Sequence, residues 1–423
     1  MMAKLSGFSR TVLLVPILVF FSHQIKQEVS VFAFQQIPIG RNFPSFQKKA
    51  TLRASASQDS STDLSEFKTW CTEQGIITPL DLRLREENDN ANEREKSEYR
   101  FMEYSDNQSF TNRPEKLGGP ILGVPLKSCI IADTPEELSI ELAKERDLGD
   151  KSFFAPYIKV LPALESSSLQ SMPRMWSDEK MDKVSEFDGG QIYQKVQTAS
   201  IKNKDLNLDP WAHACVTSRA NYLLDKGYAM TPILDMINHD SASKTSARII
   251  EDELFLSVGE EFSKGEEVFI SYGELTNLET FCNYGFVSET NGFNTEFVDV
   301  NMIRRLPVRV IIDDQSDGSL DAGSIATLRS YLTPPEDVDA LLASDENLSM
   351  NTVFTKRISK TNEEEVYSFI ASFVDEAIYE GNTGIHWARE NGDTLLETYL
   401  VARVNVLKKG LQFMKSKFPD LLY

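Results

Sequence analysis

The sequence predicts an α+β protein in which β-rich segments are divided by a helical insertion and followed by a helical C-terminal domain. The alternating residues Leu254, Leu256 and Val258 indicate a half-buried strand. Residues 152–225 have a mainly helical pattern, and apolar stripes at helical spacing return in the last third of the chain. A chain of 423 residues that is 41% hydrophobic is long enough to form two or three domains with sizeable cores.

The first well-marked helix follows a strand. Residues 121–131 predict a buried strand that is broken at Pro125. Thr134 and Glu137 have the spacing of a capping box, which predicts that a helix begins there. Gly149 is the expected end of that helix, because glycine readily adopts the left-handed conformation that ends helices.

Two further helices are expected near the C-terminus. Thr361 and Glu364 have the spacing of a second capping box, and Gly381 is the expected end of that helix. Asp393 is the expected N-cap of the final helix. The residues on one side of that helix are Leu396, Leu400, Arg403, Leu407, Leu411 and Met414.

The N-terminus has the pattern of a signal peptide. Residues 11–21 form an apolar run behind Lys4 and Arg10, and this run is too short to span a bilayer comfortably. We therefore expect residues 1–33 to be a signal peptide that is cleaved before Phe34.

The next segment has the composition of a transit peptide. Residues 34–58 contain four basic residues, no acidic residue and several serines. A signal peptide followed by such a segment resembles the bipartite plastid presequences of algae with complex plastids. The expected location is the chloroplast stroma, and secretion is the alternative.

The charge is unevenly distributed, because the first 58 residues are basic and the remainder of the chain is strongly acidic. The whole sequence has a formal charge of −20, whereas residues 1–58 contain seven basic residues and one acidic residue, which leaves −26 on the remainder. Such an acidic body repels phosphate backbones, so we expect no nucleic-acid partner. The negative charge would instead attract a basic protein segment. No membrane association is expected of the mature form.

The usual metal-site and hydrolase motifs are missing from the sequence. The four cysteines contain no CxxC pair, the four histidines are dispersed, and there is no HExxH, P-loop or GxSxG pattern. We therefore expect no metal site and no disulfide framework. The cysteines are Cys71, Cys129, Cys215 and Cys282.

Two clusters have the composition of a ligand site. Residues 233–240 place three polar residues directly after an apolar run, and buried polar groups must find partners. Residues 269–273 and 283–286 each contain a tyrosine followed by glycine. Glycine lets the backbone approach a ligand closely, and aromatic rings suit an amine or sulfonium cation. Taken alone, either cluster is more often part of a core.

Together these clusters resemble the SET-domain protein methyltransferases of the Rubisco large-subunit lysine methyltransferase subfamily. Residues 142–162 are similar to the family's signature at its helical insertion, and residues 211–219 follow its WAxxxVxSR pattern. Residues 235–239 match the DMxNH block, and residues 264–287 match the end of the SET domain. The resemblance implies a SET domain over residues 62–290.

The same resemblance supplies the expected domain organisation and activity. The SET domain would contain a knot-like crossing and a helical insertion at about 134–225, and residues 291–423 would form the helical substrate-binding domain. The implied activity is transfer of a methyl group from S-adenosylmethionine (AdoMet) to a lysine of a plastid protein, such as the Rubisco large subunit or another stromal protein. The open alternatives are methylation of histidine and a non-catalytic binding module. A monomer is favoured.

The resemblance also implies roles for individual residues. Tyr272 would be the catalytic tyrosine, with its hydroxyl near the transferring methyl group. Arg219 would meet the cofactor's carboxylate, a task that suits a planar cation with several donors. The cofactor-binding residues expected in this way are Arg219, Asp235, Asn238, His239, Tyr284 and Phe286, with no metal ligand.

Two positions depart from the family's pattern. The first cofactor motif of the family is a Gly-x-Gly-like turn, and here residues 100–122 contain only Gly118 and Gly119 in that role. The family also has a channel tyrosine about a dozen residues after the Asn-His pair. Residues 240–270 contain no tyrosine, and residues 248–250 occupy that region.

Overall fold

The computed structural model describes residues 60–86, 98–105, 120–259, 262–288, 290–302, 305–345, 347–350 and 352–419. The expected signal peptide and transit segment lie outside these residues, as do Gly118 and Gly119. No helix within the described ranges is long and apolar enough to cross a membrane.

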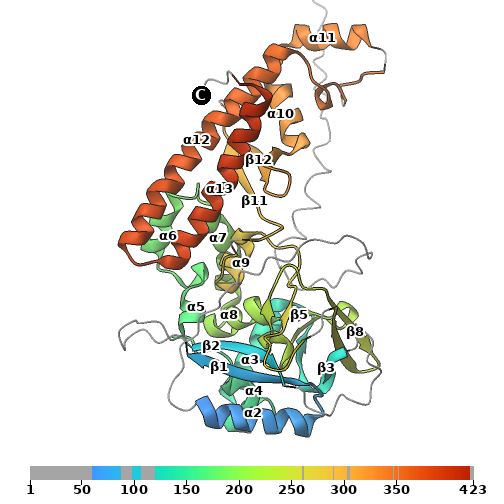
Figure 1. Ribbon diagram of the computed structural model, residues 1–423, viewed down its shortest axis with the longest axis vertical. Helices are drawn as coiled ribbons and strands as arrows, with labels where there is room; N and C mark the ends of the chain where they lie inside the picture. The colour runs from blue at the N-terminus through green and yellow to red at the C-terminus, as the bar shows by residue number, and fades with distance from the viewer. Residues whose placement is uncertain are drawn as a thin grey trace, which may run out of the picture. The chain divides into compact units, whose positions relative to one another are not determined.

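The N-terminal part contains several small sheets around one hydrophobic core. Helix α2 (Ser60–Gln74) precedes the antiparallel pair β1 (Leu80–Glu86) and β2 (Glu98–Tyr104), which lie side by side in Figure 1. The predicted strand is confirmed as β9 (Glu253–Val258), where Leu254, Leu256 and Val258 are buried and the residues between them are half-buried. Strand β3 (Pro120–Pro125) ends at the expected proline. The other sheet strands here are β8 (Thr245–Ile250) beside β9, and β4 (Ile130–Ala132), β6 (Tyr228–Met230) and β5 (Asn221–Tyr222) in a second sheet.

The expected helical insertion is present as a series of short helices. Its first helix, α3 (Pro135–Asp147), is capped by Thr134, whose hydroxyl accepts a hydrogen bond from the main-chain N–H of Glu137 at 3.2 Å. Gly149 follows the helix with a φ of 55°, as predicted. The other helices of the insertion are η3 (Gly149–Lys151), α4 (Ala155–Lys159), α5 (Ser167–Gln170), η4 (Pro173–Met175), α6 (Asp178–Ser185), α7 (Gln191–Leu206), α8 (Pro210–Arg219) and η5 (Leu224–Lys226). The single turns η2 (Leu126–Ser128) and η6 (Leu234–Met236) lie outside it.

The insertion is divided between two hydrophobic cores. Residues of α3 and α8 belong to the same core as the N-terminal sheets, whereas α6 and α7 belong to the core of the C-terminal part. Helix α9 (Asn277–Tyr284) contributes to both, because Phe281 lies in the C-terminal core and Tyr284 in the N-terminal one. Helix α9 therefore links the C-terminal core to the N-terminal core, which also contains Phe286.

The C-terminal part begins with a sheet that the helical expectation did not include. Strands β11 (Thr295–Val300), β12 (Val308–Asp313) and β13 (Ser319–Leu320) form an antiparallel sheet. Helices α10 (Ala322–Leu332), α11 (Pro335–Ser344), η7 (Val353–Thr355), α12 (Lys360–Glu390) and α13 (Thr394–Lys417) follow it, and α12 and α13 pack side by side in Figure 1.

The predicted bounds of α12 are wrong at both ends, whereas Asp393 is confirmed as the N-cap of α13. Helix α12 is capped by Ser359 instead of Thr361. Gly381 lies inside the helix, where a Cβ atom would come within 2.5 Å of the Val404 side chain of α13. The glycine therefore permits close helix packing and does not end the helix.

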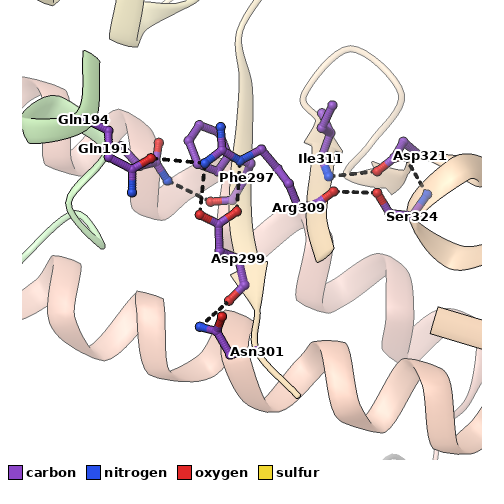
Figure 2. A network of polar contacts seen from close by, with 9 residues as sticks. All are labelled: Gln191, Gln194, Phe297, Asp299, Asn301, Arg309, Ile311, Asp321 and Ser324. Carbon is purple, nitrogen blue, oxygen red and sulfur yellow. Dashed lines mark hydrogen bonds and ion pairs between the residues drawn. The ribbon is translucent and has the colours of Figure 1, made fainter. Parts of the chain in front are cut away.

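A cross-strand ion pair in this sheet also reaches α7, because Arg309 donates from Nη2 to Oε1 of Gln194 at 3.2 Å (Figure 2). Arg309 and Asp299 lie opposite each other on β12 and β11 and form two hydrogen bonds of 2.9 Å. The Arg309 guanidinium also lies 3.8 Å from the centroid of the Phe297 ring. Gln191 donates from Nε2 to the Phe297 carbonyl at 2.8 Å, so α7 is joined directly to β11.

A buried ionic cluster lies in the same region. Arg403 of α13 places Nε 3.7 Å from Oε2 of Glu296 on β11, and both side chains are 1% exposed. The Asp188 carboxylate accepts hydrogen bonds from the main-chain N–H groups of Gly190 and Ile192. Burial raises the pKa of Asp188 to about 6 and that of Glu296 to about 7, although Arg403 opposes both shifts.

Candidate active site

The centre of the site is a pair of short parallel strands, β7 (Asn238–His239) and β10 (Phe269–Ile270), which is called the crossing below. Two predicted site residues therefore lie on one of the crossing strands. The main-chain N–H of Tyr272 donates to Nδ1 of His239 at 2.9 Å. This bond places the histidine and the expected catalytic tyrosine together, although 33 positions separate them in the chain.

His239 is a neutral, buried ring. Its Nδ1 accepts a hydrogen bond, which assigns the ring proton to Nε2. Burial lowers the pKa of His239 to about 4. The ring therefore carries no charge at neutral pH and contributes packing and one acceptor.

Tyr272 is held by its hydroxyl as well as by its main chain. The hydroxyl donates to the Ile237 carbonyl at 2.7 Å. Burial raises the pKa of Tyr272 well above its ordinary value, with a smaller contribution from the charge of Asp235. The phenol therefore stays protonated at neutral pH and acts as a hydrogen-bond donor.

Four rings form one aromatic cluster around this tyrosine. The Tyr272 ring centroid lies 4.9 Å from that of His239 and 5.1 Å from that of Tyr284. Phe286 lies 5.7 Å from His239 and 6.0 Å from Tyr284. Such faces attract cations, and the attraction is stronger where water is excluded.

Arg219 and Asp235 supply the opposite charges of the site. Arg219 ends α8 and donates from Nη1 to the main-chain carbonyl of Asp235 at 2.8 Å. The Asp235 carboxylate accepts a hydrogen bond of 2.5 Å from the hydroxyl of Tyr157. Burial raises the pKa of Asp235 to about 6, while Arg219 and the Tyr157 hydroxyl oppose that shift.

Asn238 has a carboxylate partner that the sequence did not indicate. Its Nδ2 donates to Oε1 of Glu267 at 3.0 Å, and both side chains are buried. Glu267 lies just before β10, so this bond also spans the crossing.

A pocket opens beside these residues. Of the seven predicted site residues, five line it, and the other two, His239 and Phe286, pack against the lining rings of Tyr272 and Tyr284. None of residues 248–250, which occupy the place of the family's channel tyrosine, lines the pocket; they lie on β8. The lining residues are Leu82, Val160, Pro162, Ser168, Leu169, Met172, Ser218, Arg219, Asp235, Met236, Asn238, Tyr272 and Tyr284.

Two residues that line the pocket carry opposite charges and each has one buried polar atom that needs a partner. Nε of Arg219 and Oδ1 of Asp235 are buried and have no hydrogen-bond partner among the described residues. Buried polar atoms without partners are rare in native proteins, so bound water or ligand groups are the expected partners. AdoMet carries a carboxylate, an ammonium and a sulfonium, and the guanidinium, carboxylate and aromatic rings provide matching chemistry. No group of three or more His, Cys, Asp or Glu side chains suited to a metal gathers in the described part of the chain.

Tyr157 and Glu267 are the two residues that sequence reasoning did not assign to the site. Both lie inside stretches with family-like sequence, 142–162 and 264–287. That similarity marked the segments but not which of their side chains reach Asp235 and Asn238.

The parallel pairing of β7 with β10 beside an aromatic pocket places the candidate site next to these two strands. A family model described as the SET domain matches residues 28–273, which is more than half of the chain. The chain belongs to the SET-domain family, as the sequence predicted.

Solved structures with the same fold support this assignment. The fold is similar to that of the SET domain of LSMT bound to lysine and AdoHcy, with a TM-score of 0.58 and 19% identity, covering 85% of this chain and 92% of that one. Rubisco LSMT bound to AdoMet gives a TM-score of 0.55 at 19% identity, with 85% and 93% covered. The predicted SET fold with a helical C-terminal region is thereby confirmed.

Some sequence relatives are named as histidine methyltransferases, and others are named only for their SET domain. Actin-histidine N-methyltransferase of Xenopus tropicalis is 26% identical over 297 residues, which are 64% of this chain and 49% of that protein. SET domain-containing protein 4 of Artemia parthenogenetica is 26% identical over 180 residues, which are 38% and 45% of the two chains. The chain spans about half the length of these curated relatives.

Proposed function

We propose that the protein is an AdoMet-dependent protein methyltransferase that modifies lysine side chains. The observation that carries the proposal is the convergence of Arg219, Asp235 and Tyr272 on one pocket beside the crossing of β7 and β10. When bound, AdoMet supplies an electrophilic methyl group on a sulfonium. Family membership and the likeness to structures of LSMT bound to AdoMet and to lysine support this assignment.

Each residue of the pocket has a task that its chemistry allows. Arg219 binds a carboxylate through its unpartnered Nε, and Asp235 accepts an N–H through its unpartnered Oδ1. The rings of Tyr272 and Tyr284 favour a sulfonium or an amine at their faces. Positioning of this kind supplies much of the rate in a displacement reaction, because the reacting atoms must be aligned.

The target nitrogen must be neutral when it reacts. An apolar, desolvated wall lowers the pKa of an entering lysine, so its proton is lost to solvent more readily than in water. The Tyr272 phenol stays protonated and therefore orients the substrate instead of taking its proton. The proposal that lysine is the methylated side chain agrees with the structure of the LSMT SET domain, which contains bound lysine.

The test combines binding with transfer. Calorimetric titration with AdoMet should show one binding site per chain. Arg219→Ala should weaken AdoMet binding, whereas Arg357→Ala on the C-terminal part should leave the affinity unchanged. Incubation with labelled AdoMet and plastid stromal proteins should then label a protein substrate. Undetectable binding at millimolar AdoMet would reject the enzyme and favour a non-catalytic binding module.

Methylation of histidine is the second candidate. It is favoured by the relatives named actin-histidine N-methyltransferase, which match 64% of this chain. Mass spectrometry of the labelled peptide distinguishes the two, because the added methyl is located on a lysine or on a histidine.

We also propose that the protein acts in the plastid. The support is the apolar run at residues 11–21 followed by the acid-free segment 34–58. The Rubisco large subunit and other stromal proteins are the substrates to examine first.

A further inference from the structure

Tyr157 lies behind the pocket and contacts it through a single hydrogen bond. It belongs to α4, is fully buried, and its ring stacks on Phe67 of α2 with centroids 6.1 Å apart. Its hydroxyl donates to Oδ2 of Asp235 at 2.5 Å, across 78 positions of sequence. Tyr157 is not among the residues that line the pocket.

The segment that receives this bond contains a strained residue. Ile233 has φ 70° and ψ −51°, which places a β-branched side chain in a region that such residues rarely adopt. Strained residues persist only where the surrounding structure holds them, and they gather at functional sites. The main chain after Ile233 is held by hydrogen bonds within the turn, from Asp235 N to Thr231 O and from Met236 N to Ile233 O.

The same segment supplies the groups that orient the site. The main-chain carbonyl of Asp235 accepts a hydrogen bond from Arg219, and that of Ile237 accepts one from the hydroxyl of Tyr272. Asn238 follows directly and spans the crossing to Glu267. A shift of this strained segment would therefore move the anion-binding and the catalytic side chains together.

We propose that Tyr157 is a positioning residue of the site: its hydroxyl anchors the Asp235 carboxylate and so holds the strained segment 233–239 in the conformation that places Arg219 and Tyr272. This inference rests on the proposed methyltransferase function for its kinetic readout. Its structural content concerns the segment alone and is testable without activity.

The charge state of Asp235 sets the strength of this anchor. A hydrogen bond to an ionised acceptor is about twice as strong as one between neutral groups, so protonation of the carboxyl weakens the bond from Tyr157. Arg219 is the cation that faces the carboxyl. The other titratable groups that sense Asp235 are Tyr157 on α4, Cys215 on α8, Cys71 on α2, Cys129 after η2 and Tyr272, and burial raises the pKa of each, so they are neutral near pH 7.

The experiment compares Tyr157→Phe with a matched control. Tyr399 is equally buried, but its hydroxyl has no hydrogen-bond partner among the residues that the structure describes, so Tyr399→Phe removes the same atom without removing a bond to any of them. Tyr157→Phe should raise the AdoMet dissociation constant about tenfold or more and lower kcat, whereas Tyr399→Phe should change neither. A simple loss of folded protein would lower the number of sites and leave the affinity of each unchanged.

A pH series adds a readout that a purely structural role would not move. AdoMet affinity of the parent should fall as the pH drops through about 6, where Asp235 becomes protonated. Tyr157→Phe should move this midpoint to higher pH, because the lost donor no longer stabilises the carboxylate. Asp235→Asn, which keeps an acceptor oxygen for Tyr157, should remove the pH dependence.

The possible results separate this inference from the proposed function. If the parent binds AdoMet and Tyr157→Phe keeps the parent's affinity, kcat and pH midpoint, the positioning role is wrong and the methyltransferase stands. If the parent binds no AdoMet, the proposed function is wrong, and crystal structures of the parent and Tyr157→Phe decide the inference. A displaced segment 233–239 in the variant would support it, and an unchanged segment would overturn it.

Discussion

The Tyr272 hydroxyl donates to the main-chain carbonyl of Ile237 at 2.7 Å, which fixes the ring against the segment that enters the crossing. The main-chain N–H of the same tyrosine binds His239. Tyr272 is therefore fixed at both its backbone and its side chain, and its hydroxyl oxygen, whose proton is donated to Ile237, is a preorganised acceptor beside the pocket.

Replacing Tyr272 by phenylalanine should lower the rate of methyl transfer by about a hundredfold or more. AdoMet affinity should change little, because the ring remains in the aromatic cluster. Single-turnover kinetics and calorimetry measure the two quantities separately. Tyr193→Phe, on an exposed side chain of α7, is the control and should match the parent. Equal turnover in Tyr272→Phe and the parent would exclude the proposed role.

Replacing Asn238 by alanine should weaken AdoMet binding. The change removes a buried donor and takes the amide partner from Glu267, which costs about 1–3 kcal/mol, or roughly a fivefold to 150-fold loss of affinity. Calorimetric titration measures the change. Asn382→Ala, on an exposed position of α12, should leave the dissociation constant as it is. An unaltered dissociation constant in Asn238→Ala would remove this residue from the site.

Alanine at Gly381 should destabilise the C-terminal part, although alanine favours helices. The added Cβ would meet Val404 at 2.5 Å, and overpacking of this kind costs about 1–3 kcal/mol, which over most of that range exceeds the ~1 kcal/mol gained in helix propensity. Denaturant unfolding measures the difference. Asn382→Ala, one position along the same helix and exposed, should be slightly stabilising. A gain in stability from Gly381→Ala would show that α12 and α13 do not pack this closely.

Gly381 also shows where local sequence patterns stop being informative. Asp393 and Thr134 were predicted correctly as N-caps from neighbours within three positions, whereas the same spacing placed the cap of α12 at Thr361 instead of Ser359. A glycine at a helix end and a glycine at a close helix contact look the same in sequence. Only the packing partner, Val404 on another helix, distinguishes them.

In the candidate site too, some residues could be predicted from local motifs and others could not. Asp235, Asn238 and Tyr272 stand in recognisable motifs, and the structure brings them together through the crossing of β7 and β10. The bond from Tyr157 to Asp235 and the strain at Ile233 depend on contacts between distant segments, so no local pattern contains them. The sheet β11–β13 was missed although β11 and β12 are as long as β9, because the helical stripes that follow it dominated the interpretation of the last third of the chain.

Replacing Glu296 by glutamine should change the pH dependence of stability. The pKa of Glu296 rises from 4.5 to about 7 on folding, so its favourable contribution is complete below pH 4.5 and is lost as the pH rises through 7. Each unit of pKa shift corresponds to about 1.4 kcal/mol. Glu296→Gln should therefore gain stability relative to the parent between pH 5 and pH 8. The facing groups Arg403, Asp188 and Asp314 remain in both proteins.

Urea unfolding at pH 5 and pH 8 provides the measurement for Glu296→Gln. The control is Glu365→Gln, since Glu365 is exposed on α12 and its replacement should leave the two curves parallel. A difference between Glu296→Gln and the parent that stays constant across this range would show that Glu296 is ionised throughout.

Residues 1–58 should direct a fluorescent protein into the plastid of an alga with a complex plastid. The reason is the apolar run at residues 11–21, suited to the first membrane crossing, followed by a segment with four basic residues and no acid. Phe34→Ala should leave the fusion in the outer compartments, because Phe34 would begin the transit segment after signal cleavage. Fluorescence microscopy measures both outcomes, and Phe43→Ala, inside the same segment, is the matched control that should still enter the plastid. Secretion of the unaltered fusion into the medium would establish the alternative and exclude a stromal substrate.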